Sequence, residues 1–147
     1  MIYSNFLSFI FNREKDFTMT NILLVEDELS ILKLYEIVLS TNGFQVIAKA
    51  KNGEEAVNKY KKMHKKIDVI IMDHRMPLKN GLEATKEILE INHNAKIIFA
   101  TADEEIEQKA RKLGIASFKK KPFSNQRLVN NIYKAMKKNQ NAPINLV

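Results

Sequence analysis

Short apolar runs alternate with amphipathic segments from Thr20 onward, and this alternation constrains the fold more than any other feature of the sequence. Five runs have the length and apolar character of strands: residues 21–25, 44–48, 68–73, 96–100 and 116–120. Strands that are joined through helices must run parallel, with right-handed crossovers between them. The sequence therefore predicts a doubly wound α/β fold, in which a five-stranded parallel sheet has helices on both faces.

The segments between these runs carry apolar residues at helical spacing. The first helix is expected to bury Ile31, Leu34, Tyr35 and Val38, and Gly43 is expected to end it in a left-handed conformation. A polar helix is expected over residues 104–113. The inward-facing residues expected of the other helices are Ala56, Val57, Tyr60 and Met63, then Ala84, Ile88 and Ile91, and finally Val129, Ile132, Tyr133 and Met136.

Length and cysteine content limit the class of protein. A chain of 147 residues is typical of one domain. Without cysteine it has neither disulfides nor thiolate metal sites, which fits a cytoplasmic location. The start MIYSNFLSFIF is apolar but too short to cross a bilayer, and no secretory cleavage site follows it. We interpret residues 1–18 as an N-terminal extension outside the fold or an amphipathic anchor, residues 19–138 as the domain, and residues 139–147 as a polar tail without an output domain.

The net charge of +7 is unevenly distributed, because every charged residue from position 119 onward is basic. This group could meet nucleic acid or anionic lipid. No aromatic interleaving or DNA-reading motif accompanies it, so a solvated face is the favoured interpretation and nucleic-acid binding is not expected. The group consists of Lys119, Lys120, Lys121, Arg127, Lys134, Lys137 and Lys138.

Functional side chains are expected to gather where the predicted strands end. Ligands of open parallel sheets bind outside the carboxyl ends of the strands. Glu26 and Asp27 follow the first strand, Asp73 ends the third, Thr101 follows the fourth and Lys121 follows the fifth. Any one of these could be a helix cap or a surface charge. Helix capping explains their joint occurrence at four strand ends poorly.

Three carboxylates at one edge indicate a cation site. Two unit charges at 4 Å repel by about 4 kcal/mol at an effective dielectric constant near 20, so a bound cation would be needed to keep the group ionised. All-oxygen ligands suit Mg²⁺, which also binds phosphate. A carboxylate beside Mg²⁺, with an ammonium and a hydroxyl group nearby, is equipped for phosphoryl transfer.

These residues resemble the receiver domain of two-component response regulators, as found in stand-alone, chemotaxis-type receivers. The resemblance covers residues 21–138 and rests on LLVEDE, DVIIMDHRMPLKNGLEA, ATA and GIASFKKKPF in this order. It implies the flavodoxin-like strand order 2-1-3-4-5 and a role in phosphorelay signal transduction.

The resemblance also implies a role for each motif residue. Asp73 is expected to be the phosphoacceptor, with Lys121 and Thr101 contacting the phosphoryl group. Phe118 is expected to act with Thr101 as the conformational switch, and the Lys121–Pro122 bond is expected to be cis. The expected Mg²⁺ ligands are Asp27, Asp73, Glu26 through water and the backbone carbonyl of Arg75.

Partners follow from the same resemblance. The phosphoryl donor would be a sensor histidine kinase or a histidine phosphotransfer protein. A downstream protein would bind the face formed by the fourth helix, the fifth strand and the fifth helix. Catalysis would be limited to self-phosphorylation and self-dephosphorylation.

Two other classes of function remain open on the sequence. One is an Mg²⁺-dependent aspartyl phosphatase, although Arg75 stands where such enzymes carry a second acid. The other is nucleic-acid binding by the basic C-terminal helix. Arg75 and Asp103 could also meet across the site and alter the access of water to an acyl phosphate. None of His64, His74 and His93 has metal-ligand spacing.

Overall fold

The structure is a computed structural model that describes residues 19–137. The interpretations of residues 1–18 and 139–147 lie outside the described residues. The strands are β1 (Asn21–Val25), β2 (Gln45–Ala50), β3 (Val69–Met72), β4 (Ile97–Thr101) and β5 (Ser117–Lys120). The helices are α2 (Leu29–Thr41), α3 (Gly53–Met63), α4 (Gly81–Ile91), the 3-10 turn η1 (Glu104–Ile106), α5 (Glu107–Leu113) and α6 (Asn125–Lys137).

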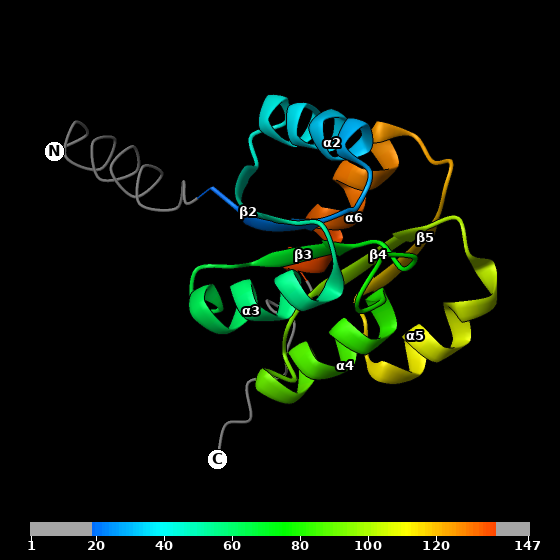
Figure 1. The fold of residues 1–147 in the computed structure, drawn as a ribbon. Helices are drawn as coiled ribbons and strands as arrows, with labels where there is room; N and C mark the ends of the chain where they lie inside the picture. Colours follow the sequence, from blue (N-terminus) through cyan, green and yellow to red (C-terminus); the bar gives the residue numbers. More distant parts are fainter. Residues whose placement is uncertain (1–18, 138–147) are drawn as a thin grey trace, which may run out of the picture.

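The five strands form one parallel sheet in the order β2-β1-β3-β4-β5, which confirms the predicted topology. Helices α2 and α6 cover one face, and α3, α4 and α5 cover the other (Figure 1). The direction of the crossovers reverses between β1 and β3. The carboxyl ends of these two central strands therefore form the switch point where ligands of such sheets bind. No helix within residues 19–137 has the length and apolar character needed to span a membrane.

Alternating residues of the central strands build two cores, one on each face of the sheet. Leu23 and Val25 pack on the side of α3 and α4, whereas Ile22 and Leu24 pack on the side of α2 and α6. This division follows from the period of two along a strand, which sends successive side chains to opposite faces. All four are at most 1% exposed. The central strands therefore rest in packed surroundings on both sides.

The start of α4 is specified by its cap. The Asn80 side chain accepts a hydrogen bond from the Glu83 N–H at 2.9 Å, and the Glu83 carboxylate accepts one from the Asn80 N–H at 3.2 Å. This is a capping box. The first helical residue, Gly81, packs directly against the end of β3: a Cβ atom there would lie 2.1 Å from the Asp73 carbonyl oxygen. Gly81 thus permits a close approach of helix and strand end.

Three predicted inward-facing residues are exposed, so these predictions were wrong. Leu34 is 52% exposed because α2 is rotated so that Leu32 and Leu39 face the sheet with Tyr35 and Val38. Ile91 is 37% exposed at the last position of α4, and Tyr133 is 49% exposed on α6. Tyr133 contacts the ring of Phe44, with ring centroids 5.2 Å apart.

Local boundaries differ from the prediction in two further places. Residues 104–113 form a 3-10 turn followed by a helix, because the Asp103 carboxylate accepts a hydrogen bond from the Glu105 N–H at 3.2 Å and caps the turn. Strand β2 extends to Ala50, which pairs with Val25. Gly43 has φ of 83°, which confirms the left-handed conformation expected at the end of the first helix.

Candidate functional site

Backbone hydrogen bonds beyond the strand ends hold the predicted site residues. The Asp73 N–H donates to the Val25 carbonyl oxygen at 3.0 Å, and the Lys121 N–H donates to the Thr101 carbonyl oxygen at 2.8 Å. The Glu26 N–H donates to the carbonyl oxygen of Ala50 at 3.0 Å. These bonds continue the sheet by one residue at three strands. The side chains that follow β1, β3 and β5 are therefore placed by the sheet itself.

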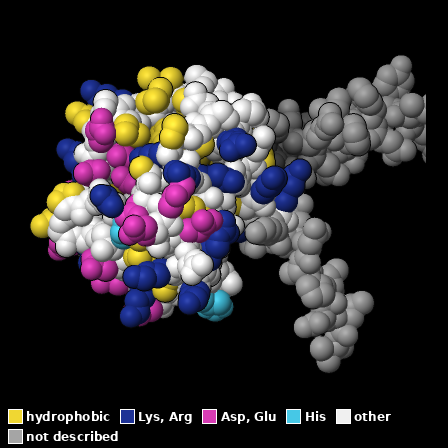
Figure 2. Space-filling view, turned by 90° about the vertical axis from the view of Figure 1, so that its right-hand side faces the viewer, with side chains coloured by type: hydrophobic (Ala, Val, Ile, Leu, Met, Phe, Trp, Pro, Cys, Tyr) yellow, Lys and Arg dark blue, Asp and Glu magenta, His cyan; other side chains and the backbone are white. Residues whose placement is uncertain are grey.

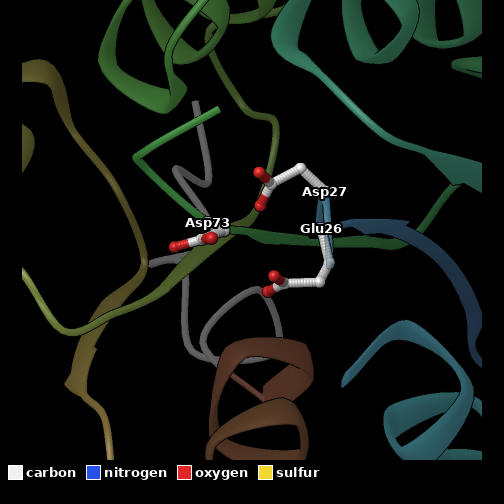
Figure 3. A group of neighbouring side chains, drawn as sticks. All are labelled: Glu26, Asp27 and Asp73. Atoms are coloured by element: carbon white, nitrogen blue, oxygen red, sulfur yellow. The ribbon is translucent and has the colours of Figure 1, made fainter. Parts of the chain in front are cut away.

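Three carboxylates converge at the switch point. One oxygen from each of Glu26, Asp27 and Asp73 lies within 4.8 Å of the other two. Figure 3 shows Asp27 and Glu26 leaving the end of β1 in opposite directions, with Asp73 between their carboxylates. Glu26 is 2% and Asp73 9% exposed, whereas Asp27 is exposed. The predicted acidic group thus forms on two adjacent strand ends.

Lys121 brings the positive charge of the site. Its Nζ donates to Glu26 Oε2 at 2.8 Å and lies 3.9 Å from Asp73 Oδ2. The same ammonium group lies 5.8 Å from the centroid of the Tyr35 ring, which stacks on Phe123 at 6.2 Å. An ammonium group over an aromatic face is attracted by the ring quadrupole. No sequence pattern predicts this contact of Tyr35, because Tyr35 lies on α2, far from Lys121 in the chain.

Burial changes the ionisation of the group. Burial raises the pKa of Asp73, against the opposing effect of the Lys121 ammonium. Burial also raises the pKa of Glu26, although the hydrogen bond from Lys121 acts in the opposite direction. Burial and the charges of these two carboxylates raise the pKa of Tyr35 to about 12. One lysine does not compensate the desolvation of the carboxylates, so a further cation is favoured here.

An ion pair crosses the rim of the site, as the sequence suggested. Arg75 Nε lies 3.1 Å from Asp103 Oδ2, and the Arg75 side chain is 80% exposed. The hydrogen bond from Arg75 holds the pKa of Asp103 below its usual value. The Asp103 N–H in turn donates to Thr101 Oγ1 at 3.3 Å. Hydrogen bonds of Asp103 therefore connect Arg75 at the rim with the buried Thr101 hydroxyl.

These side chains line one cavity of about 360 Å³. Figure 2 looks onto this edge of the sheet and shows acidic side chains near its centre, with basic side chains around them. The predicted site residues that line the cavity are Glu26, Asp27, Asp73, Arg75, Thr101 and Lys121. Asp103 and Glu28 line it as well. Glu28 stands in the acidic run EDE, but its position alone did not distinguish it from a helix cap.

The predicted switch residue Phe118 is buried on β5. It is 6% exposed and stacks on Phe99 with ring centroids 6.1 Å apart. Its position agrees with either a core residue or an aromatic switch, and the switch role stays a prediction. The Lys121–Pro122 bond is cis, as expected.

His74 is the buried histidine of the site region. It is 9% exposed, and its Nδ1 has no hydrogen-bond partner among residues 19–137. Burial lowers the pKa of His74. Its backbone N–H donates to Asp73 Oδ1 at 2.8 Å, so this residue orients the acidic side chain through its main chain.

Those members of the C-terminal basic group that lie within residues 19–137 do not form one face. Lys121 turns into the cavity, and Lys120 forms an ion pair with Glu104. Lys134 and Lys137 lie near the opposite end of the domain, in the last turn of α6. This division weakens the interpretation as a continuous surface for nucleic acid.

The donor set fits a hard divalent cation. The three converging groups are all carboxylates, and two of them are buried enough for their pKa values to be raised. Mg²⁺ is bound by one or two carboxylates together with water and phosphate oxygens. The carbonyl oxygen of Arg75 stays a predicted additional ligand.

Comparison with known proteins shows the family of the chain. Residues 22–133 match the model of the response regulator receiver domain family. The chemotaxis protein CheY of Thermotoga maritima is 37% identical over 118 residues, which cover 79% of this chain and 97% of that protein. CheY of Bacillus subtilis is 37% identical over 117 residues, which cover 78% and 96% of the two chains.

Solved structures share the fold. The response regulator TrrA of Thermotoga maritima, in complex with Mg(2+)-BeF, matches with a TM-score of 0.73 and 32% identity, over 80% of this chain and 99% of that one. The CheX-CheY-BeF3-Mg+2 complex of Borrelia burgdorferi matches with a TM-score of 0.74 and 30% identity, over 77% of this chain and 86% of that one.

Proposed function

The chain belongs to the response regulator receiver family, and from this premise we propose that it accepts a phosphoryl group on Asp73 with the help of Mg²⁺. Proteins of this CheY-like family are signalling proteins. The observation that carries the proposal is the position of the Asp73 carboxylate, which lies close to the acidic pair that follows β1 and to the Lys121 ammonium inside one cavity.

The chain's own residues supply the chemistry as follows. An oxygen of Asp73 attacks the phosphorus of a phospho-histidine donor. The bond between phosphorus and the imidazole nitrogen breaks, and its electron pair stays on the nitrogen, which takes up a proton. Lys121, close to both Asp73 and Glu26, compensates the charge of the transferred phosphoryl oxygens, and the Thr101 hydroxyl donates to one of them. Mg²⁺, held by Asp27, Asp73, water bound to Glu26 and the Arg75 carbonyl, would supply charge neutralisation.

Hydrolysis returns the protein to its starting state. Water attacks the phosphorus of the acyl phosphate, the bond to the Asp73 oxygen breaks, and the carboxylate and inorganic phosphate are released. Arg75 and Asp103 form an ion pair and line the same cavity as Asp73, and we propose that this pair limits the access of the attacking water. We expect both activities to act on the protein itself and not on a separate substrate.

Output would follow from a change in protein binding. The Thr101 hydroxyl is drawn toward the phosphoryl group, and Phe118 moves into the space that it leaves. The surface that changes is formed by α5, β5 and α6, the fourth helix, fifth strand and fifth helix of the alternation. A sensor histidine kinase or a histidine phosphotransfer protein would act as donor in the cytoplasm, and an unidentified protein would bind the changed surface.

The phosphatase alternative has less support. A general acid must carry a proton near neutral pH. Asp103 is the acidic residue beside Arg75, but the hydrogen bond from Arg75 holds the pKa of Asp103 below its usual value. The Arg75–Asp103 pair thus makes Asp103 a poor proton donor for a leaving group.

The test is phosphorylation by acetyl phosphate with Mg²⁺, followed by mass spectrometry of the intact protein. We expect the mass of one phosphoryl group to be added to the wild type and not to Asp73→Asn. The matched control is Asp68→Asn, which changes an exposed carboxylate at the opposite edge of the sheet and should be modified like the wild type. Modification of Asp73→Asn at the wild-type level would overturn the proposal, and steady turnover of a generic phosphomonoester would favour the phosphatase.

A further inference from the structure

Leu78, in the loop between β3 and α4, is the most exposed large hydrophobic residue within residues 19–137, at 81%. It alone among the non-glycine residues of that range has a positive φ, of 65°. The Lys79 N–H donates to the Pro77 carbonyl oxygen at 2.7 Å, which makes Leu78 the middle residue of a classic γ-turn. Such turns are rare and strained, and positive φ is an outlier for a bulky side chain. The loop therefore holds an apolar side chain in water on an unfavourable backbone.

Hydrogen bonds hold this loop in place. The Gly81 N–H donates to the His74 carbonyl oxygen at 2.9 Å and closes the loop. The Gly53 N–H, at the start of α3, donates to the Lys79 carbonyl oxygen at 2.9 Å. Because the backbone around Leu78 is already ordered, a partner that contacts this side chain loses little free energy to ordering it.

The charged side chains of the loop are already paired. Lys79 Nζ lies 2.7 Å from Glu87 Oε2, and Arg75 Nε lies 3.1 Å from Asp103 Oδ2. A partner could bind either positive charge only in competition with these carboxylates. The group that the loop offers without such competition is the apolar side chain of Leu78.

Leu78 lies close to the candidate site. It precedes Gly81 by three residues, and a fully extended chain of that length spans at most about 11 Å. Gly81 in turn packs directly against the Asp73 carbonyl oxygen. A typical interface buries about 800 Å² on each protein, which corresponds to a patch roughly 30 Å across. A protein that brings a phosphohistidine to Asp73 thus has an interface wide enough to cover Leu78, whereas acetyl phosphate is far too small.

We propose that Leu78 is a docking residue for the protein that donates the phosphoryl group, and that its side chain enters an apolar recess of that protein. The inference rests on the proposed function and adds the chemistry by which the donor recognises this loop. Burial of a leucine side chain at an interface is favourable. Strained backbone is found at sites where ligands are held. Docking through Leu78 accounts for both its exposure and its backbone conformation.

The test compares a small phosphoryl donor with a protein donor. Leu78→Asn removes the apolar surface and keeps a residue type that adopts positive φ, whereas Leu78→Met keeps the apolar surface. The small donor is acetyl phosphate with Mg²⁺. The protein donor is a purified sensor histidine kinase, phosphorylated on its histidine, that transfers its phosphoryl group to the wild type.

We expect Leu78→Asn to react with acetyl phosphate at the wild-type rate and to lose at least about tenfold in kcat/KM for transfer from the kinase. The loss should appear in KM, because docking and not the chemical step is changed. Leu78→Met should stay within about threefold of the wild type. The matched control is Met19→Asn, which removes a 47% exposed apolar residue before β1, at the opposite edge of the sheet, and should behave like the wild type.

Two kinetic outcomes would overturn the proposal. One is equal transfer from the kinase to the wild type and to Leu78→Asn. The other is an equal loss with kinase and acetyl phosphate, because the substitution would then act on the site itself and not on docking. A wild type that accepts phosphoryl groups from acetyl phosphate but from no histidine kinase of its organism would overturn docking and leave Asp73 as the acceptor. A wild type that is not modified by acetyl phosphate would contradict the proposed function itself.

Thermal unfolding of the same variants separates docking from packing. We expect Leu78→Asn to unfold at or slightly above the wild-type midpoint, since asparagine adopts positive φ more readily than leucine. A midpoint several degrees below that of the wild type would assign the Leu78 side chain to stabilisation of the fold and would count against docking.

Discussion

At the carboxyl edge of the sheet, oxygens of Glu26, Asp27 and Asp73 lie within 4.8 Å of one another, whereas at the amino edge Lys61 and Lys65 are exposed side chains without ion-pair partners in the described residues. The carboxyl edge places like charges together in partly buried surroundings. This arrangement is unfavourable for the isolated domain and suits a bound cation and short-range chemistry. The amino edge keeps its charges in water, where they act on a large surface at longer range.

The largest expected effect separates the lysines of the two edges. Lys121→Ala should reduce the rate of phosphorylation by acetyl phosphate about a hundredfold, because it removes a positioned charge from the transition state. Lys96→Ala, at the amino edge, should leave the rate unchanged. Stopped-flow or mass-spectrometric rates would measure both. If Lys121→Ala were phosphorylated as fast as the wild type, the lysines of the two edges would not differ in their effect on the reaction, and the comparison would fail.

Mg²⁺ should stabilise the domain through the carboxyl edge alone. At about a hundredfold excess over its dissociation constant, Mg²⁺ should raise the thermal unfolding midpoint by about 5–10 °C. Asp27→Asn should abolish most of this rise, and Asp68→Asn, at the amino edge, should retain it. Differential scanning calorimetry with and without a chelator would provide the values. A rise that survives Asp27→Asn would place the cation elsewhere.

Asp73→Asn should make the metal-free domain more stable at neutral pH, by about 1 kcal/mol. The pKa of Asp73 is raised in the folded state, so its protonated form favours folding. This contribution is present below the unfolded pKa near 4 and is lost as the pH rises through the raised folded pKa. The advantage of the variant should therefore shrink as the pH falls toward 4.

Urea unfolding at several pH values would measure this difference. Asp68→Asn gives the contrast, because the Asp68 carboxylate accepts the Asn21 N–H and its loss should destabilise the domain. If the wild type and Asp73→Asn had the same free energy of unfolding at pH 7 without metal, the ionised Asp73 carboxylate would not destabilise the folded domain.

The smallest expected effect concerns the rim of the carboxyl edge. Arg75→Ala and Asp103→Ala should each accelerate loss of the phosphoryl group by about two- to fivefold, since exposed ion pairs contribute up to about 1 kcal/mol. The double variant should add little to either single change. Arg111→Ala, which breaks an exposed pair with Glu107 on α5, is the control. Unchanged decay of the phosphorylated protein in both single variants would exclude a role for the pair in limiting water.

The carboxyl edge was predictable because its position follows from topology. Once the strands are parallel, Glu26, Asp73 and Lys121 must emerge at the same edge, whatever the detailed packing. The Arg75–Asp103 pair was suggested by the positions of the two residues in the receiver family, and the ion pair is present. The backbone thus fixes these residues through a few hydrogen bonds at the strand ends.

Packing details were less predictable. Helix α2 is apolar on several sides, so its sequence alone did not decide whether Leu34 or Leu32 faces the sheet, and the choice depends on contacts with distant residues. Ile91 matched the helical period but stands at the last position of α4. The contact of Tyr35 with Lys121 joins two ends of the chain and leaves no local pattern.

Gly81 shows how the proposed phosphoacceptor Asp73 depends on a residue that takes no part in the proposed reaction. Its missing side chain admits the Asp73 carbonyl oxygen, and its N–H donates to the His74 carbonyl oxygen at 2.9 Å. Any larger residue would have to displace the backbone that carries the acceptor. A library of all single substitutions, selected for signalling, would therefore be as intolerant at Gly81 as at Asp73. Excluded volume alone can make a position as indispensable as a nucleophile.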